Sequence, residues 1–81
     1  MDWYVYILRC GDGTLYTGMT DNMERRLAAH RAGKGAKYTR GRGPLELVYQ
    51  ERQPDKAAAL RREYALKRLS RADKLRLIGA K

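Results

Sequence analysis

Two helical positions carry side chains suited to phosphate chemistry. Arg26 and His30 lie four residues apart in a predicted helix, so they share one face, beside Met23 and Leu27. That face should pack on a sheet, where an unpartnered arginine is uncommon. A guanidinium fork there could hold a phosphate oxygen and stabilise a transition state, or it could reach solvent or pair with an acid. His30 taken alone is most simply a hydrogen-bonded, half-buried histidine.

Glu63 occupies a position where a charge is costly. In the predicted helix it falls in the middle of an apolar arc made by Ala59, Leu60 and Leu66. A carboxylate that faces a core must be paired or bound to a metal. Glu63 is therefore a candidate ligand for one Mg²⁺ or Mn²⁺ ion, with phosphate and water completing the shell. The alternative is an ion pair with Lys67, one helical turn later.

Two tyrosines are brought together by a predicted hairpin. The runs Trp3–Arg9 and Thr14–Thr17 are rich in aromatic and β-branched residues, and they flank a Cys-Gly-Asp-Gly turn at positions 10–13. The hairpin places Tyr6 near Tyr16, although a shared face depends on the register of the two strands. Tyrosines also fill half-buried strands for no catalytic reason, because their rings suit a pleated surface.

The spacing of these residues resembles a known family. Tyr4-Val5-Tyr6, followed ten residues later by Tyr16-Thr17-Gly18, is similar to the paired signature of the GIY-YIG nuclease superfamily. Arg26, His30 and Glu63 follow in the order in which that superfamily carries its functional arginine, a histidine one turn later and a metal-binding glutamate. The resemblance covers nearly the whole chain and is closest to the small stand-alone bacterial (YhbQ-like) branch.

The sequence differs from the family signature at three positions. The resemblance nevertheless implies a specific reaction, the hydrolysis of a phosphodiester bond. Tyr4 replaces the first glycine, Thr17 the isoleucine, and Met19 stands where some branches have lysine. The resemblance implies an endonuclease in which water attacks phosphorus and Tyr6 or Tyr16 accepts its proton. With an ordinary pKa near 10, either tyrosine needs help from the metal, the arginine or the histidine. In this scheme the arginine holds the phosphoryl oxygen and the glutamate holds Mg²⁺ or Mn²⁺.

The composition of the segment 31–44 predicts a loop that binds nucleic acid. It contains four glycines and no acidic residue, and a loop of this length is unusual in a small domain. Cations bind phosphates, and an aromatic ring can stack on an unpaired base. The residues predicted to contact nucleic acid are Arg31, Lys34, Lys37, Tyr38, Arg40 and Arg42. The alternative is a solvated basic loop.

Composition limits the class of protein. The chain has 81 residues, and its 18 Lys and Arg against 9 Asp and Glu give a net charge of +9. We expect one domain over residues 1–81 that binds a polyanion, DNA or possibly RNA, unless the charge serves only solubility. A single cysteine, Cys10, excludes an internal disulfide, and no segment is long enough to span a membrane. We therefore expect a cytoplasmic protein with no membrane partner.

The predicted fold is α+β, a small three-stranded antiparallel sheet flanked by helices in the order β-β-α-β-α-α. Thr20, Asp21 and Asn22 are N-cap candidates for the first helix, Asp21 and Glu24 resemble a capping box, and the helix is expected to end at about Arg31. The next elements are a strand at 45–50 with Leu45, Leu47 and Tyr49 on one face, and a helix at 56–69 capped by Asp55. A short helix follows, capped by Ser70 in a second box with Asp73, and its residues Ala72, Leu75 and Ile78 are expected to pack inward.

These predictions lead to a metal-dependent endonuclease that hydrolyses DNA phosphodiester bonds. Larger relatives add recognition modules for which this chain has no room, so we expect weak activity that is selective for branched or nicked DNA, as in DNA repair. Two alternatives stay open. One is a nucleic-acid-binding protein that does not cleave, and the other is a subunit that becomes active only with a protein partner.

Overall fold

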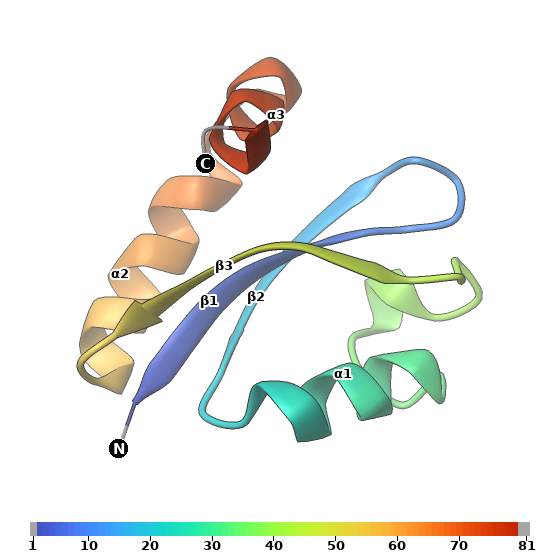
Figure 1. The fold of residues 1–81 in the computed structure, drawn as a ribbon, viewed down its shortest axis with the longest axis horizontal. Helices are drawn as coiled ribbons and strands as arrows, with labels where there is room; N and C mark the ends of the chain where they lie inside the picture. Colours follow the sequence, from blue (N-terminus) through green and yellow to red (C-terminus); the bar gives the residue numbers. More distant parts are fainter. Residues whose placement is uncertain (1, 80–81) are drawn as a thin grey trace.

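The computed structural model describes residues 2–79 and confirms the predicted fold class. Three strands form one antiparallel sheet in the order β2-β1-β3, with helices on both of its faces (Figure 1). The elements are β1 (Trp3–Arg9), β2 (Leu15–Thr20), α1 (Met23–Arg31), a single 3₁₀ turn (Lys37–Thr39), β3 (Glu46–Gln53), α2 (Lys56–Lys67) and α3 (Arg71–Gly79).

The central strand β1 is buried on both sides, as its two apolar faces predict. Tyr6 and Leu8 belong to a cluster that Met23 and Leu27 of α1 cover. On the other face, Val5 packs with α2 in a second cluster, whose buried helical members are Ala59 and Leu66. The sheet thus separates two small cores.

The register of β1 and β2 puts the two tyrosines of the hairpin on one face. Tyr6 lies opposite Gly18, and Leu8 lies opposite Tyr16. Because side chains alternate along a strand, all four residues face α1. β2 extends to Thr20, three residues beyond the predicted end, so Gly18 is a paired strand residue.

β3 contains a bulge that the sequence analysis missed. Leu47 pairs with Leu8, Tyr49 pairs with the preceding Ile7, and Val48 is the extra residue between them. The bulge shifts the alternation, so Leu47 packs on the α1 side and Tyr49 on the α2 side. The prediction that both lie on one face is therefore wrong. The strand also continues to Gln53, directly before the proline at 54.

Helix starts follow the predicted cap residues with one correction. Asn22, and not Asp21, caps α1, because its side chain accepts a hydrogen bond from the Arg25 amide. Asp55 caps α2 and Ser70 caps α3, as predicted. These caps fix where each helix begins, and therefore which of its residues turn toward the sheet.

Three predicted core positions lie outside the core. Leu60 of α2 is 48% exposed, Leu75 of α3 is 42% exposed, and Ala72 of α3 is exposed as well. Leu77 packs against the α2-side cluster instead. Helix α3 follows the C-terminal end of α2 and runs in a different direction (Figure 1). The spacing of its apolar residues does not predict this orientation, and therefore does not predict which of them face the core. Across residues 2–79, every helix is too short or too polar to cross a bilayer.

Candidate active site

The hydroxyl of Tyr6 is the centre of the site. Tyr6 is fully buried in β1, and its Oη lies 2.8 Å from Nε2 of His30 on α1. Nε of Arg26, one turn earlier on α1, donates a longer hydrogen bond of 3.4 Å to the same oxygen. The i, i+4 spacing of arginine and histidine thus brings both side chains to one phenol, as the shared helical face predicts.

Three contacts bear on the tautomer of His30. Nδ1 lies 2.9 Å from Oγ1 of Thr39, that hydroxyl lies 3.0 Å from the carbonyl of Ala36, and the amide of Ala36 donates a long 3.5 Å hydrogen bond to Nδ1. The two shorter contacts fit a threonine hydroxyl that donates to the carbonyl and accepts from Nδ1–H, whereas the long amide contact fits the other tautomer; we assign the proton to Nδ1 on the shorter contacts, which leaves the lone pair of the imidazole on Nε2. We therefore assign the hydroxyl of Tyr6 as the donor to Nε2. His30 is placed to take a proton from Tyr6.

Burial keeps both partners neutral at physiological pH. Desolvation raises the pKa of Tyr6 above its ordinary value, and the hydrogen bond from Arg26 offsets this only in part. Desolvation also lowers the pKa of His30, and the positive charge of Arg26 lowers it further. A neutral phenol that donates to a neutral imidazole agrees with the assigned tautomer.

Tyr16 is held in a column of stacked groups. Its ring lies 6.4 Å from Tyr6 and stacks on Tyr38 at 5.8 Å between ring centres. The guanidinium of Arg42 covers Tyr38 at 4.5 Å, and it forms a 2.6 Å ion pair with Asp12 in the hairpin turn. The ring of Tyr38 therefore contacts Tyr16 and Arg42, and a base could stack on it only after Arg42 moves.

Two glycines make room for the central hydrogen-bonded pair. A Cβ atom on Gly18 would lie 2.6 Å from Oη and 2.8 Å from Cζ of Tyr6. A Cβ atom on Gly35 would collide with Nδ1 of His30 and would lie 2.9 Å from its Cα. Contacts this short are not tolerated in a packed interior. The glycine-rich composition of the 31–44 loop thus has a partly steric cause.

Glu63 lies on the buried side of α2, between Ala59 and Leu66, as predicted. Its side chain is only 18% exposed and forms an ion pair with Lys67 at 3.4 Å, so the anticipated pairing is also present. Burial and the neighbouring Tyr16 raise the pKa of Tyr6 more than the negative charge of Glu63 does. Within residues 2–79, no hydrogen bond or ion pair joins the Glu63 carboxylate to Tyr6, Arg26 or His30.

The donor set around Glu63 suits a magnesium-type ion. Within residues 2–79 there is no group of three or more histidine, cysteine or acidic side chains that could form a closed metal cage. Mg²⁺ often binds through one or two carboxylates and keeps its other positions for water and substrate phosphate. Glu63 fits that mode, and the ion pair with Lys67 engages only its Oε2.

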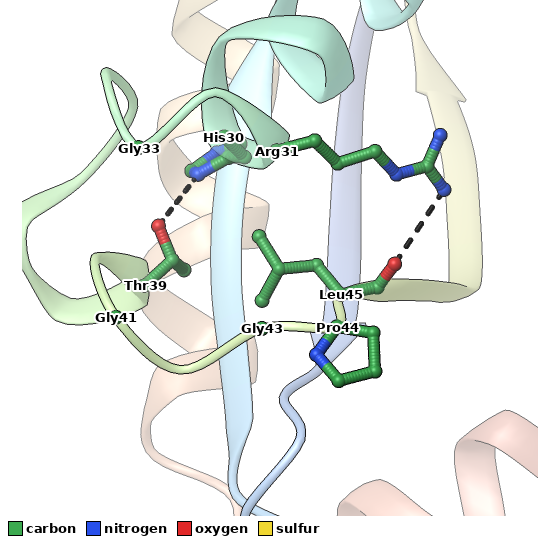
Figure 2. Close-up of a pocket in the computed structure, with 8 residues that line it drawn as sticks. All are labelled: His30, Arg31, Gly33, Thr39, Gly41, Gly43, Pro44 and Leu45. Carbon is green, nitrogen blue, oxygen red and sulfur yellow. Dashed lines mark hydrogen bonds between the residues drawn. The ribbon is translucent and has the colours of Figure 1, made fainter.

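A cavity of about 380 Å³ opens beside His30, on the Nδ1 side of the ring (Figure 2). The end of α1 and the glycine-rich loop form its walls, and Arg31 crosses it to donate a 3.5 Å hydrogen bond to the carbonyl of Leu45. The lining residues are His30, Arg31, Gly33, Thr39, Gly41, Gly43, Pro44 and Leu45. Thr39 is a site residue that the sequence analysis missed, because nothing local distinguishes it from other loop threonines.

The predicted nucleic-acid-binding cations divide into two kinds. Arg31 and Arg42 are engaged by Leu45 and Asp12. The other three, Lys34, Lys37 and Arg40, are exposed, and none forms a salt bridge to any residue in the described part of the chain. These three are therefore the cations of the loop that are available to a phosphate backbone.

Comparison with known proteins gives one consistent result. The model of the GIY-YIG catalytic domain matches residues 2–76. A UPF0213 protein from Natronomonas pharaonis is 62% identical over 78 residues, which cover 96% of this chain and 92% of that protein. A UPF0213 protein from Oceanobacillus iheyensis is 57% identical over 75 residues, with 93% and 87% covered.

Two solution NMR structures resemble this fold. The UPF0213 protein BH0048 from Bacillus halodurans is 53% identical, with a TM-score of 0.65 over 100% of this chain and 86% of that one. The protein EF2693 from E. faecalis is 36% identical, with a TM-score of 0.68 over 99% and 85%. Both similarities extend over all the elements that carry the candidate site residues.

Proposed function

The chain belongs to the GIY-YIG catalytic domain family, and we propose that it is a metal-dependent endonuclease that hydrolyses DNA phosphodiester bonds. The family is a nuclease superfamily, and the metal, the DNA substrate and the residue roles are our proposals. The observation that carries them is the buried hydrogen bond from Tyr6 to His30, with Arg26 at the same oxygen. A phenol with an internal proton acceptor and a cation beside it is a geometry suited to proton transfer at a phosphate.

In the proposed reaction Tyr6 is the general base and His30 is its proton acceptor. Tyr6 is fully buried in the free protein, so this scheme requires the side chains over Oη to move when substrate binds. As a water oxygen bonds to phosphorus, one of its protons passes to Oη of Tyr6, and the phenolic proton passes to Nε2 of His30. The bond from phosphorus to the leaving oxygen breaks, the leaving oxygen takes a proton from solvent, and His30 later returns its proton to solvent. Tyr6 is favoured over Tyr16 because Tyr6 has the imidazole lone pair within 2.8 Å. The relay never requires a free phenolate, which the raised pKa of Tyr6 disfavours.

Arg26 is proposed to hold the phosphoryl group. Only its Nε reaches Tyr6, and that bond is long at 3.4 Å, so the terminal nitrogens can form a fork on phosphate oxygens. A cation at this position also stabilises the negative charge that grows on the phosphoryl oxygens in the transition state. Its charge already lowers the pKa of His30, which keeps the imidazole ready to accept a proton.

Glu63 is proposed to hold a single Mg²⁺ or Mn²⁺ ion. When bound, such an ion would supply Lewis-acid stabilisation of the phosphate and the leaving oxygen. The carboxylate is nearly enclosed and close enough to influence Tyr6, and it can contribute one ligand. The ion pair with Lys67 engages Oε2 alone, at 3.4 Å, so a metal ion would bind Oε1 or compete with the ammonium group for Oε2.

The substrate is proposed to be DNA with a nick or a branch, and the cations Lys34, Lys37 and Arg40 are proposed to contact its backbone. A second candidate function is nucleic-acid binding without cleavage, and the Glu63–Lys67 ion pair favours it, because it occupies the one proposed metal ligand. A third is a subunit whose protein partner supplies specificity. All three use the same basic surface, so binding alone does not separate them.

Cleavage assays with matched variants separate the proposals. Purified protein would be incubated with nicked and branched DNA in Mg²⁺, in Mn²⁺ and in chelator, beside Glu63→Gln and Arg26→Ala. An endonuclease of this mechanism needs the metal, loses cleavage in both variants and keeps DNA binding in Glu63→Gln. DNA binding without cleavage of any substrate would favour the binder or the partner-dependent subunit.

A further inference from the structure

A second concavity lies near Tyr16, at the edge of the sheet. It has a volume of about 220 Å³ and is formed by three segments that are distant in sequence: the start of β2, the 3₁₀ turn and α3. Its lining residues are Thr14, Leu15, Tyr38, Arg71 and Lys74. The sheet ends at β2, so this side of the hairpin is not covered by another strand.

Two cations of α3 project charge into this concavity. Arg71 and Lys74 are three residues apart on one helix, so they lie on the same face. Neither forms a salt bridge within residues 2–79, and Asp73 between them is engaged by Arg76. Asp12 binds the hydroxyl of the lining residue Thr14 and the guanidinium of Arg42. The cavity therefore offers two positive charges that form no salt bridge with a carboxylate of the described residues.

The other side of the cavity is suited to a sugar or a base. Leu15 and Tyr38 provide apolar and aromatic surface, and Thr14 completes the wall. Cations next to an aromatic residue form the combination by which proteins hold single strands, with phosphate on the charge and the base against the ring. In a duplex each base is stacked on both sides and paired at its edge. Only an unpaired nucleotide can therefore place its base against an aromatic ring of the protein.

We propose that this concavity binds one nucleotide of an unpaired strand, with its phosphate on Arg71 and Lys74 and its base or sugar against Leu15 and Tyr38. A base that stacks on Tyr38 displaces Arg42 from that ring, because Tyr16 covers the other face. The inference rests on the proposed function and adds a source of substrate selectivity to it. Tyr38 stacks on Tyr16, and Tyr16 is the neighbour of Tyr6, so a strand held here leads directly to the proposed catalytic residues. The preferred substrate is then a duplex with a single-stranded tail.

The test is a binding measurement that needs no cleavage. Fluorescence anisotropy in chelator would compare a linear duplex with the same duplex carrying a single-stranded tail of about 10 nucleotides, within the range of one single-strand site. The variant is Arg71→Ala/Lys74→Ala. The control is Arg52→Ala/Arg61→Ala, which removes the same charge from exposed residues outside the concavity. Circular dichroism would verify that both variants fold.

The cavity variant should bind tailed DNA at least about tenfold more weakly and linear duplex less than about threefold more weakly. The slope of log K against log salt for the tail should fall by about 1.4, the value for two single-strand phosphate contacts. The control should weaken both DNAs equally. An equal loss on both DNAs in the cavity variant, or no loss, would overturn the proposal.

The outcome is independent of catalysis. Preference for tailed DNA that depends on Arg71 and Lys74 supports the subsite even if purified protein cleaves nothing, in which case the endonuclease proposal fails alone. Metal-dependent cleavage that is lost in Glu63→Gln, combined with unchanged tail binding in the cavity variant, refutes the subsite and leaves the endonuclease standing.

Discussion

Replacement of Gly18 by alanine should damage both the fold and the site, because the added methyl group meets the hydroxyl of Tyr6. The ideal Cβ position is 2.6 Å from Oη and 3.0 Å from Cε2 of Tyr16. An ordinary contact between these atoms is about 3.5 Å, so the tyrosine would have to move by several tenths of an ångström or more. Tyr6 is fully buried and tied to His30, which leaves it little freedom to move.

The expected magnitude follows from two opposing effects. Overpacking of a filled interior costs about 1–3 kcal/mol, while loss of the flexible glycine from a strand returns about 0.5–1 kcal/mol. The net loss in the free energy of unfolding then spans about 0–2.5 kcal/mol and centres near 1 kcal/mol. For a domain of this size the central value corresponds to a decrease in Tm of roughly 4–8 °C. Displacement of Oη from Nε2 should lower cleavage by about 10- to 100-fold.

Thermal unfolding by circular dichroism and the nicking assay would be run on Gly18→Ala beside Gly79→Ala. Gly79, at the end of α3 and outside both cavities, is the matched control, since a Cβ atom there meets no other atom within 4 Å and its φ angle is not positive. The control should keep the wild-type Tm and cleavage rate. If Gly18→Ala matched the control in both measurements, the packing account of Tyr6 would be wrong.

Three further predictions concern charge. The cleavage rate should rise with pH through a midpoint below 6.5, because His30 must be neutral to accept a proton and its pKa is lowered. The rate should show no fall due to Tyr6 below pH 10, because the pKa of Tyr6 is raised. A rate that increases on acidification to pH 5 would contradict the relay. Glu63→Gln should abolish cleavage and change DNA affinity less than about threefold, measured by anisotropy; strong residual metal-dependent cleavage would exclude Glu63 as the essential ligand. Arg42→Ala should lower the free energy of unfolding by less than about 1 kcal/mol, since the ion pair of Arg42 with Asp12 is partly exposed. The same change should speed amide hydrogen exchange across residues 36–42, because the guanidinium no longer covers the ring of Tyr38. Unchanged exchange would show that Arg42 does not hold the loop.

The sequence predicted the elements well where local signals are strong. The Gly-Asp-Gly turn between two β-rich runs identified the hairpin, and the caps Asp55 and Ser70 identified two helix starts. It also placed Arg26 and His30 on one face, because helical spacing fixes which residues are neighbours.

What the sequence did not predict depends on tertiary contacts. The bulge at Val48 reversed the face of Tyr49, since one inserted residue shifts a period of two. The hydrogen bond from His30 to Thr39 and the stacking of Arg42 on Tyr38 arise from the path of a loop, for which no periodic pattern exists. The orientation of α3 exposes Leu75 and packs Leu77 against the α2-side cluster. The orientation of so short a helix is set by its tertiary contacts, and the spacing of its own apolar residues does not predict it.

The most direct test of the central claim is the cleavage rate of Tyr6→Phe on branched DNA in Mg²⁺, beside Tyr49→Phe. Tyr49 is the matched control, because it also loses a hydrogen-bonded, part-buried hydroxyl but packs on the other face of the sheet. The proposed relay predicts a loss of at least about 100-fold for Tyr6→Phe, the usual effect of a general base, and a change of less than about threefold for the control. Cleavage at the wild-type rate by folded Tyr6→Phe would contradict the claim that Tyr6 transfers the proton.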